Sequence, residues 1–299
     1  MAGGRTRRRR LAGAAVAALA ASALWAAPAG AVPACPDAPQ PRVLADRQGS
    51  LEAVAVDGAG RIYYSATDFK AVMRIDAPGE APQAVAGAIE APGGIVVEDD
   101  GSLVVTEGDS LLNGVLGNLV GLARLWRLEP ATGRRTLIAE GLGMGNGLAR
   151  GPDGTFYASN DLGLALDRIR GSRVERWATV LSANGLAVGP SGHWLYAAQA
   201  FAPAAIVRIR LDDPRDVATW ARPGLPDIAA GLDGMTIDAA GRLYVAANLA
   251  GEVWRVDRDR SICALARGLG QPSAVALRGD DAIVVGFGGQ VVELPGAVP

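Results

Sequence analysis

The feature that most restricts the fold of this chain is a hairpin-like segment that occurs six times. Each copy has a run of apolar and small residues, a turn rich in Gly, Asp or Pro, and a second apolar run. This pattern is typical of two antiparallel strands, and a period of about 40 to 50 residues is typical of propeller blades. The six segments are EAVAVDGAGRIYYSA from Glu52, GGIVVEDDGSLVVTE from Gly93, NGLARGPDGTFYASN from Asn146, NGLAVGPSGHWLYAA from Asn184, DGMTIDAAGRLYVAA from Asp233 and PSAVALRGDDAIVVG from Pro272.

Each repeat continues with two further strand-like runs, as in GEVWRVD and SICALAR after the fifth hairpin. Four strands in each of six repeats predict an all-β, six-bladed β-propeller. The stretch RVLADR precedes Glu52 at the same offset as CALARG precedes Pro272. We therefore expect the N-terminal strand to complete the last blade, which would protect an otherwise open sheet edge.

The N-terminus has the pattern of an export signal. Arg5 and Arg7 to Arg10 precede an apolar, Ala-rich stretch, and Ala29-Gly30-Ala31 forms a small-residue cleavage site. This pattern predicts a signal peptide over 1–31, cleaved near Val32, and a single propeller domain over 32–299 in a secreted or periplasmic protein. The arginines also match twin-arginine export. A membrane anchor is less favoured because Pro28 interrupts the stretch, and a lipoprotein is less favoured because Pro33 is atypical before Cys35.

Composition narrows the class of partner. The 299-residue chain has a formal net charge of −2, and its one basic cluster lies at the N-terminus. No later segment carries a basic stripe with interleaved aromatic residues, so nucleic acid is not an expected partner. We expect a monomer that acts on a small molecule. Cys35 and Cys263 are the two cysteines, and in an oxidising compartment they are predicted to form a disulfide between the fifth and sixth blades.

The first residues of the six hairpins should form a ring, because the first strands of a propeller line its central channel and start from one face. The ring contains the oxygen donors Glu52, Asn146, Asn184 and Asp233, separated only by Gly93 and Pro272. Two carboxylates and two carboxamides suit a hard divalent cation, with Ca²⁺ the preferred ion. Taken singly, Asn184-Gly185 is a common hairpin turn. Binding of a metal ion is favoured because four oxygen donors occupy the same position in aligned repeats.

The residues that carry this pattern resemble the gluconolactonase and senescence marker protein family, which is related to diisopropylfluorophosphatase, paraoxonase and strictosidine synthase. The resemblance covers the mature chain and is most specific in NGLAVGPSGHWLYAA and in LDGMTIDAAGRLYVA. It implies a six-bladed propeller that binds a divalent ion, commonly calcium, at the channel and hydrolyses lactones or phosphoesters. It also implies the ligand set Glu52, Asn146, Asn184 and Asp233.

The chain departs from the family pattern at two points. Sugar-lactone members usually have an Arg two residues before the first ligand Asn, where this chain has Met144. The usual Glu-Gly-Pro is replaced by Glu52-Ala53-Val54. Both departures weaken the expectation of a sugar-lactone substrate and leave the metal site intact.

Few residues could activate water in this chain. His193, the one histidine, follows Gly192 in a turn expected on the opposite face, and there is no G-x-S-x-G motif. Carboxylates remain: Asp233, or less favourably Glu52, would accept a proton from water or attack the substrate directly.

We expect the long connections 108–124 and 223–234 to lie on the ligand face. They would form an apolar wall for substrate or, as an equal alternative, a small satellite core; the predicted substrate contacts are Leu111, Leu112, Leu116, Met144 and Leu225.

Three functions fit these observations. The favoured one is an exported, metal-dependent lactonase or esterase. The alternatives are a non-catalytic calcium-binding propeller that acts as a binding module and a phosphotriesterase-type hydrolase. A condensing enzyme like strictosidine synthase is disfavoured by the complete set of four ligand residues.

Overall fold

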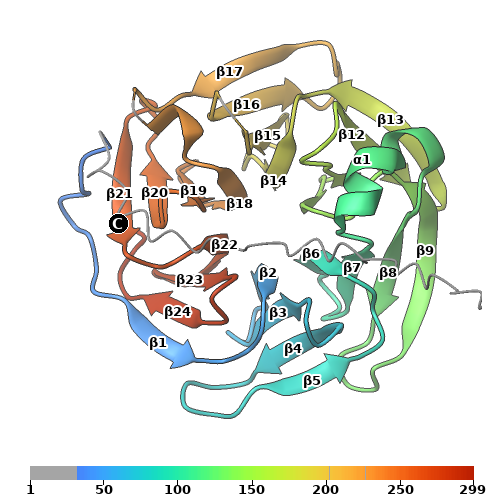
Figure 1. Ribbon diagram of the computed structural model, residues 1–299, viewed down its shortest axis with the longest axis horizontal. Helices are drawn as coiled ribbons and strands as arrows, with labels where there is room; N and C mark the ends of the chain where they lie inside the picture. Colours follow the sequence, from blue (N-terminus) through green and yellow to red (C-terminus); the bar gives the residue numbers. More distant parts are fainter. Residues whose placement is uncertain (1–31, 202, 226) are drawn as a thin grey trace, which may run out of the picture.

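The computed structural model of the chain describes residues 32–201, 203–225 and 227–299. Its strands form six four-stranded antiparallel sheets arranged around a central axis (Figure 1). The prediction of an all-β, six-bladed propeller is confirmed. The predicted signal peptide over 1–31 lies outside the described residues.

The first three blades follow the chain from the channel outward, with the first strand of each blade innermost. They contain β2 (Leu51–Val56), β3 (Ile62–Ala66), β4 (Ala71–Ile75) and β5 (Gln83–Ala86); β6 (Pro92–Val97), β7 (Leu103–Glu107), β8 (Ala123–Leu128) and β9 (Arg135–Leu142); β10 (Leu148–Arg150), β11 (Phe156–Ala158), β12 (Ala165–Arg170) and β13 (Arg173–Thr179).

The last three blades repeat this order, and the sixth takes its outer strand from the N-terminus. They contain β14 (Ala183–Val188), β15 (Trp194–Gln199), β16 (Ala205–Arg210) and β17 (Val217–Ala221); β18 (Leu232–Ile237), β19 (Leu243–Ala247), β20 (Glu252–Val256) and β21 (Ile262–Arg267); β22 (Pro272–Arg278), β23 (Asp281–Gly286) and β24 (Val291–Leu294), with β1 (Arg42–Ala45) beside β24.

Turn chemistry explains why the hairpins begin and end where they do. The turns between the first and second strands of the first five blades contain Gly60, Gly101, Gly154, Gly192 and Gly241, each with φ between 69° and 86°. Residues with a Cβ rarely adopt this left-handed conformation. The recurring glycine of the sequence repeat is therefore required by the backbone of each turn.

The apolar core lies between neighbouring blades. One cluster, for example, packs Ala204 and Ile206 of the fourth blade against Leu243 and Trp254 of the fifth. Alternate residues of each strand face opposite neighbours, so every blade is covered on both sides. This packing fixes the position of each inner strand relative to the next and so fixes the ring of residues at the channel mouth.

The N-terminal segment closes the ring in two places. In β1, Arg42 pairs with Glu293 of β24, so β1 completes the sixth blade as predicted. Upstream, Ala34 forms a parallel bridge with Ala264 of β21, and a disulfide joins Cys35 to Cys263. The segment thus links the fifth and sixth blades.

One insertion forms a helix. The connection between β7 and β8 contains α1 (Leu111–Val120), capped by the Ser110 side chain and ended by Gly121 with φ of 57°. It lies beside the channel mouth (Figure 1). No helix in the described ranges is long and apolar enough to cross a membrane.

Candidate active site at the channel mouth

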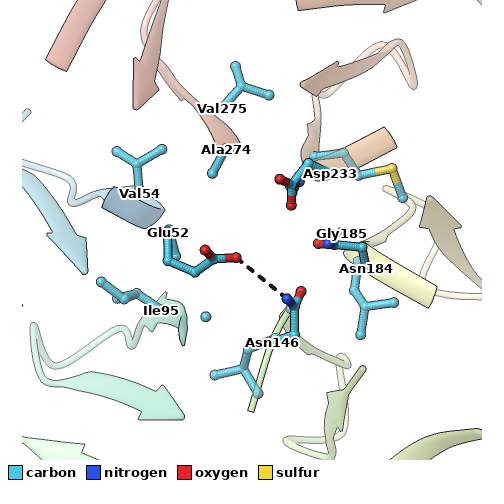
Figure 2. Close-up of a pocket in the computed structure, with 16 residues that line it drawn as sticks. Glu52, Val54, Ile95, Asn146, Asn184, Gly185, Asp233, Ala274 and Val275 are labelled. Carbon is cyan, nitrogen blue, oxygen red and sulfur yellow. Dashed lines mark hydrogen bonds between the residues drawn. The ribbon is translucent and has the colours of Figure 1, made fainter. Parts of the chain in front are cut away.

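The four predicted ligand residues meet at one end of the channel. Glu52 comes from β2, Asn184 from β14 and Asp233 from β18, while Asn146 precedes β10 by two residues. Their polar ends point toward one another, and Nδ2 of Asn146 donates to Oε1 of Glu52 at 3.4 Å (Figure 2). Asn146, Asn184 and Asp233 are only 5–6% exposed.

A bulge in β2, β14 and β18 turns Glu52, Asn184 and Asp233 toward the axis. The pairing register of the inner strand shifts between Leu51 and Val54, between Ala183 and Leu186, and between Leu232 and Met235. An unpaired residue in such a bulge can aim its side chain away from the regular alternation. Asn184-Gly185 therefore belongs to a bulge within a strand rather than to a hairpin turn.

The glycine that follows Asn146, Asn184 and Asp233 allows neighbouring inner strands to approach closely, whereas Glu52 is followed by Ala53. A Cβ at Gly185 would lie 2.4 Å from the carbonyl oxygen of Asp233, and one at Gly147 would lie 2.3 Å from that of Asn184. Any side chain there would push the inner strands apart. The Asn-Gly and Asp-Gly pairs of the sequence thus place successive oxygen donors within reach of a common centre.

Backbone contacts hold Asn146 in place. Its carbonyl accepts a hydrogen bond of 2.6 Å from the N–H of Gly94, and the hydroxyl of Thr106 donates to the carbonyl of Gly145 at 2.6 Å. One turn upstream, the N–H of Gly143 donates to Asp167 at 2.7 Å. The GLGMGNG stretch is consequently ordered through contacts to the second blade and to β12.

Two further carboxylates lie at the mouth that the sequence analysis did not select. Asp109 follows β7, and its Oδ1 accepts a hydrogen bond of 3.2 Å from Asn146. Asp161 follows β11 and lines the same cavity. Both come directly after second strands, which end at the face where the first strands begin. An acidic residue after the second strand of a repeat was the signal that could have revealed them.

Burial and mutual repulsion dominate the electrostatics of the site. Burial raises the pKa of Glu52 well above its usual range, and the charges of Asp109 and Asp233 add to the effect. The pKa of Asp233 is raised in the same way, first by burial and then by Asp109 and Asp161. Burial, together with the charge of Asp161, raises the pKa of Asp109 to about 7.

Basic groups do not compensate these carboxyls. Within the described ranges, no Arg, Lys or His forms an ion pair with Glu52, Asp109, Asp161 or Asp233. The same residues include no group of three or more His, Cys, Asp and Glu side chains that could hold a metal by themselves. A cation at this mouth would therefore also need the amide oxygens of Asn146 and Asn184.

Above the ring is a cavity of about 280 Å³ that has both polar and apolar residues in its lining. The polar residues are the acidic and amide residues described above, together with Asn248. The apolar residues are Met144, Ala200, Phe201, Leu232, Leu249 and Phe287.

The structure places one of the five predicted substrate contacts in the lining of the cavity and the other four outside it. Met144 lines the cavity and is 5% exposed. Leu111, Leu112 and Leu116 on α1, and Leu225 before β18, do not line it, and their exposed fractions range from 40% to 77%. These leucines stand at the outer rim and form neither the cavity wall nor a buried satellite core.

The fold and the mouth define a six-bladed propeller with an acidic and amide-lined channel. Residues 163–283 match the model of the SMP-30/Gluconolactonase/LRE-like region. This match confirms, over that part of the chain, the resemblance predicted from the sequence. A comparison with curated proteins found no match.

Several solved structures share the fold. A gluconolactonase from Xanthomonas campestris is 20% identical, with 90% of this chain and 99% of that chain covered and a TM-score of 0.70. A calcium-binding protein, regucalcin, from Agrobacterium tumefaciens is 18% identical, with 86% and 93% covered and a TM-score of 0.69. A luciferin-regenerating enzyme is 15% identical, with 86% and 95% covered and a TM-score of 0.66.

Proposed function

We propose that this protein is an exported hydrolase of lactones or esters that depends on a divalent cation, most favourably Ca²⁺, held by Glu52, Asn146, Asn184 and Asp233. The observation that carries this proposal is the group of four uncompensated carboxyls at the channel mouth. Four such groups can share a buried site only if most stay protonated or if a cation neutralises them. The similarity to a gluconolactonase and to a calcium-binding propeller supports the second alternative.

The residues present fit a hard cation. Two carboxylates and two carboxamides supply oxygen atoms only, which suits Ca²⁺ better than zinc or copper. The amide Nδ2 of Asn146 faces Glu52 and Asp109, which leaves its oxygen free for another partner. Asn248 donates to Asp233 at 3.4 Å and would orient this carboxylate as an outer partner of the site.

In the proposed hydrolysis, the cation and the protein's own side chains would have different roles. When bound, a divalent cation polarises a carbonyl oxygen and stabilises the negative charge that develops on it. Asp233 would accept the proton of the attacking water, because it is a carboxylate that lines the cavity where the substrate would bind. Glu52 is the alternative base from the opposite side of the ring. The mouth cavity would hold the part of the substrate that does not react.

The cavity favours substrates with an apolar portion. Met144 occupies the position where sugar-lactone members of the family usually have an Arg, and Phe201 and Leu249 line the same cavity. These side chains offer no hydrogen bonds to sugar hydroxyls. We therefore propose alkyl lactones or aryl esters over sugar lactones.

A substrate screen with the metal removed and restored tests this function. Purified protein would be treated with a chelator, and hydrolysis of alkyl lactones, sugar lactones, aryl esters and phosphotriesters would be measured with and without added Ca²⁺. We expect turnover of alkyl lactones or aryl esters that disappears with chelator and returns with Ca²⁺. Phosphotriesters as the best substrates would favour the phosphotriesterase alternative. If Ca²⁺ raised the melting temperature without supporting turnover of any substrate, the protein would instead be a binding propeller.

A further inference from the structure

The backbone nitrogen of Val32 lies against a buried carboxylate far away in the sequence. It donates a hydrogen bond of 2.9 Å to Oδ2 of Asp227. Val32 is 4% exposed and Asp227 is 9% exposed. The sequence places the end of the export signal at Ala29-Gly30-Ala31, so Val32 would be the first residue of a processed chain.

Val32 is held on both sides of its peptide unit. Its carbonyl accepts a hydrogen bond of 2.6 Å from Nη2 of Arg267, and the carbonyl of Pro33 accepts one of 2.7 Å from the N–H of Ala264. The disulfide of Cys35 follows directly. These contacts fix the Val32 nitrogen beside Asp227 independently of the hydrogen bond between them.

Asp227 has no other strong partner among the described residues. It begins the short 3-10 helix η1 (Asp227–Ala229) in the connection from β17 to β18. Within the described ranges, no Arg, Lys or His forms an ion pair with Asp227, and the Val32 N–H is the one donor found for its side chain. A neutral amide offsets only part of the cost of burying a carboxylate, whereas a positive charge at the same position offsets much more.

We propose that proteolytic removal of the export signal after Ala31 creates an α-ammonium group at Val32 that forms a buried ion pair with Asp227. In this step an export peptidase and one water molecule break the Ala31–Val32 peptide bond. Ala31 keeps the new carboxylate and Val32 becomes an amine, which binds a proton from solvent because an α-amino group has a pKa of about 8. The pairing does not depend on the proposed hydrolase activity.

The ion pair would lock one wall of the mouth cavity. In the connection that contains Asp227, the carbonyl of Ile228 accepts a hydrogen bond from the N–H of Ala204 at 2.7 Å. The carbonyls of Ala230 and Gly231 accept hydrogen bonds from Leu249 and Asn248 at 2.9 Å and 2.8 Å. Leu249 and Asn248 line the cavity. Processing would therefore stabilise the segment that leads into Asp233.

The test compares two full-length chains expressed in a host that exports them. One is the natural sequence, and the other has Ser-Thr inserted between Ala31 and Val32, which moves the new amino group away from Asp227. N-terminal sequencing should find Val32 first in the natural product. We expect the inserted chain to melt about 5 °C lower, because the buried carboxylate loses its charged partner. Amide hydrogen exchange over 227–231 should also be faster in the inserted chain.

Substitution of the carboxylate completes the experiment. Asp227→Asn should lower the melting temperature of the natural chain and abolish the difference between natural and inserted chains. Asp99→Asn is the control, since the Asp99 side chain is 98% exposed, and it should leave that difference unchanged. The comparison of natural and inserted chains needs no substitution, so it decides the question even if Asp227→Asn fails to fold. Equal melting temperatures for the natural and inserted chains, or a natural product that does not begin at Val32, would overturn the proposal.

Discussion

The side-chain amide of Asn248 donates a hydrogen bond of 3.4 Å to Oδ2 of Asp233, across the first two strands of the fifth blade. The same amide donates a hydrogen bond of 3.1 Å to the carbonyl of Pro272, the residue that begins the inner strand of the sixth blade. Asn248 is therefore fixed by a neighbouring blade while it orients the carboxylate that we propose as both ligand and base.

Asn248→Ala should weaken cation binding without removing any proposed ligand. Loss of a partner that orients a metal ligand typically costs 10- to 100-fold in affinity, and we expect a rise of about 10-fold in the Kd for Ca²⁺ by titration calorimetry. Gln199→Ala is the matched control, because Gln199 ends the second strand of the fourth blade and donates to the carbonyl of Leu181 at the surface. Equal Ca²⁺ affinity in both variants would show that Asn248 has no orienting role.

Asp233→Asn should separate binding from catalysis. The substitution keeps an oxygen donor and removes the charge and the basicity, so Ca²⁺ should still bind, more weakly, at saturating concentrations. Loss of a general base costs about 10²- to 10⁴-fold, and we expect a fall of this size in kcat on the best substrate.

Asn184→Asp is the complementary variant to Asp233→Asn. It adds a negative charge to the ring and leaves Asp233 intact, so Ca²⁺ should bind at least as tightly while turnover falls moderately. Turnover by Asp233→Asn close to that of the natural protein, with Ca²⁺ saturating, would transfer the role of base to Glu52 or would favour a binding protein.

Stability should fall with rising pH when the metal is removed. The folded protein raises the pKa values of Glu52 and Asp233, and that of Asp109 to about 7. A carboxyl with a raised pKa binds its proton more tightly in the folded state. Its stabilising contribution is complete below the unfolded value of about 4 and is lost as pH rises through the folded value.

Calorimetry at two pH values tests this expectation. In chelator, the melting temperature should be lower at pH 8 than at pH 5, and Ca²⁺ should raise it more at pH 8, where the carboxyls are charged. Asp109→Asn should reduce the difference between the two pH values because one of the raised groups is removed. A metal-free protein that is more stable at pH 8 would contradict the assignment of these shifts.

The fold and the meeting of four oxygen-donor residues at the channel mouth could be predicted because both follow from one repeated pattern. Aligning the hairpins placed Glu52, Asn146, Asn184 and Asp233 in one column, and the symmetry of a propeller converts a column into a ring. Asp109 and Asp161 were missed because they lie where second strands pass into irregular connections, so the alignment gave them no common column. Their role depends on contacts between blades that a single repeat does not contain.

The orientation of α1 could not be predicted for a different reason. In the segment LLNGVLGNLV the Leu and Val residues fall on one side of a helix and the Gly and Asn residues on the other, so hydrophobic periodicity alone would favour packing of the Leu and Val side. In the structure the glycines face the protein: a Cβ at Gly114 would lie 2.6 Å from the side chain of Leu162, and one at Gly117 would lie 1.5 Å from the carbonyl oxygen of Gly143. The large side chains of the helix therefore point outward, at the rim of the mouth.

Removal of the disulfide should destabilise the propeller without changing the site. The bond joins residues 228 positions apart, and disulfides typically contribute about 2 to 4 kcal/mol by restricting the unfolded chain. The double variant Cys35→Ser with Cys263→Ser should melt several degrees lower, with an unchanged Kd for Ca²⁺. An unchanged melting temperature would mean that the pairing of β1 with β24 alone closes the ring.

Gly117→Ala should show whether α1 controls the cavity wall at Met144. The added methyl group cannot fit beside Gly143, so either α1 moves away or Gly143 shifts. Arg176 couples the two segments, because it donates to the carbonyl of Gly117 at 2.7 Å and pairs with Asp167, which binds the N–H of Gly143. A shift there would reach Met144 before it reaches Asn146, which is held separately by Gly94.

We therefore expect Gly117→Ala to change the ratio of kcat/KM for bulky and small substrates by about 10-fold, equivalent to about 1.4 kcal/mol in transition-state binding. The Kd for Ca²⁺ should change by less than about 2-fold, since titration of the ion reports on the ring rather than on the wall. Gly87→Ala is the control, because a Cβ at Gly87 would meet no atom within 4 Å. A lower melting temperature with unchanged selectivity would mean that α1 contributes packing alone, and the selectivity would then have to come from the other apolar residues that line the cavity, such as Phe201, Leu249 and Phe287.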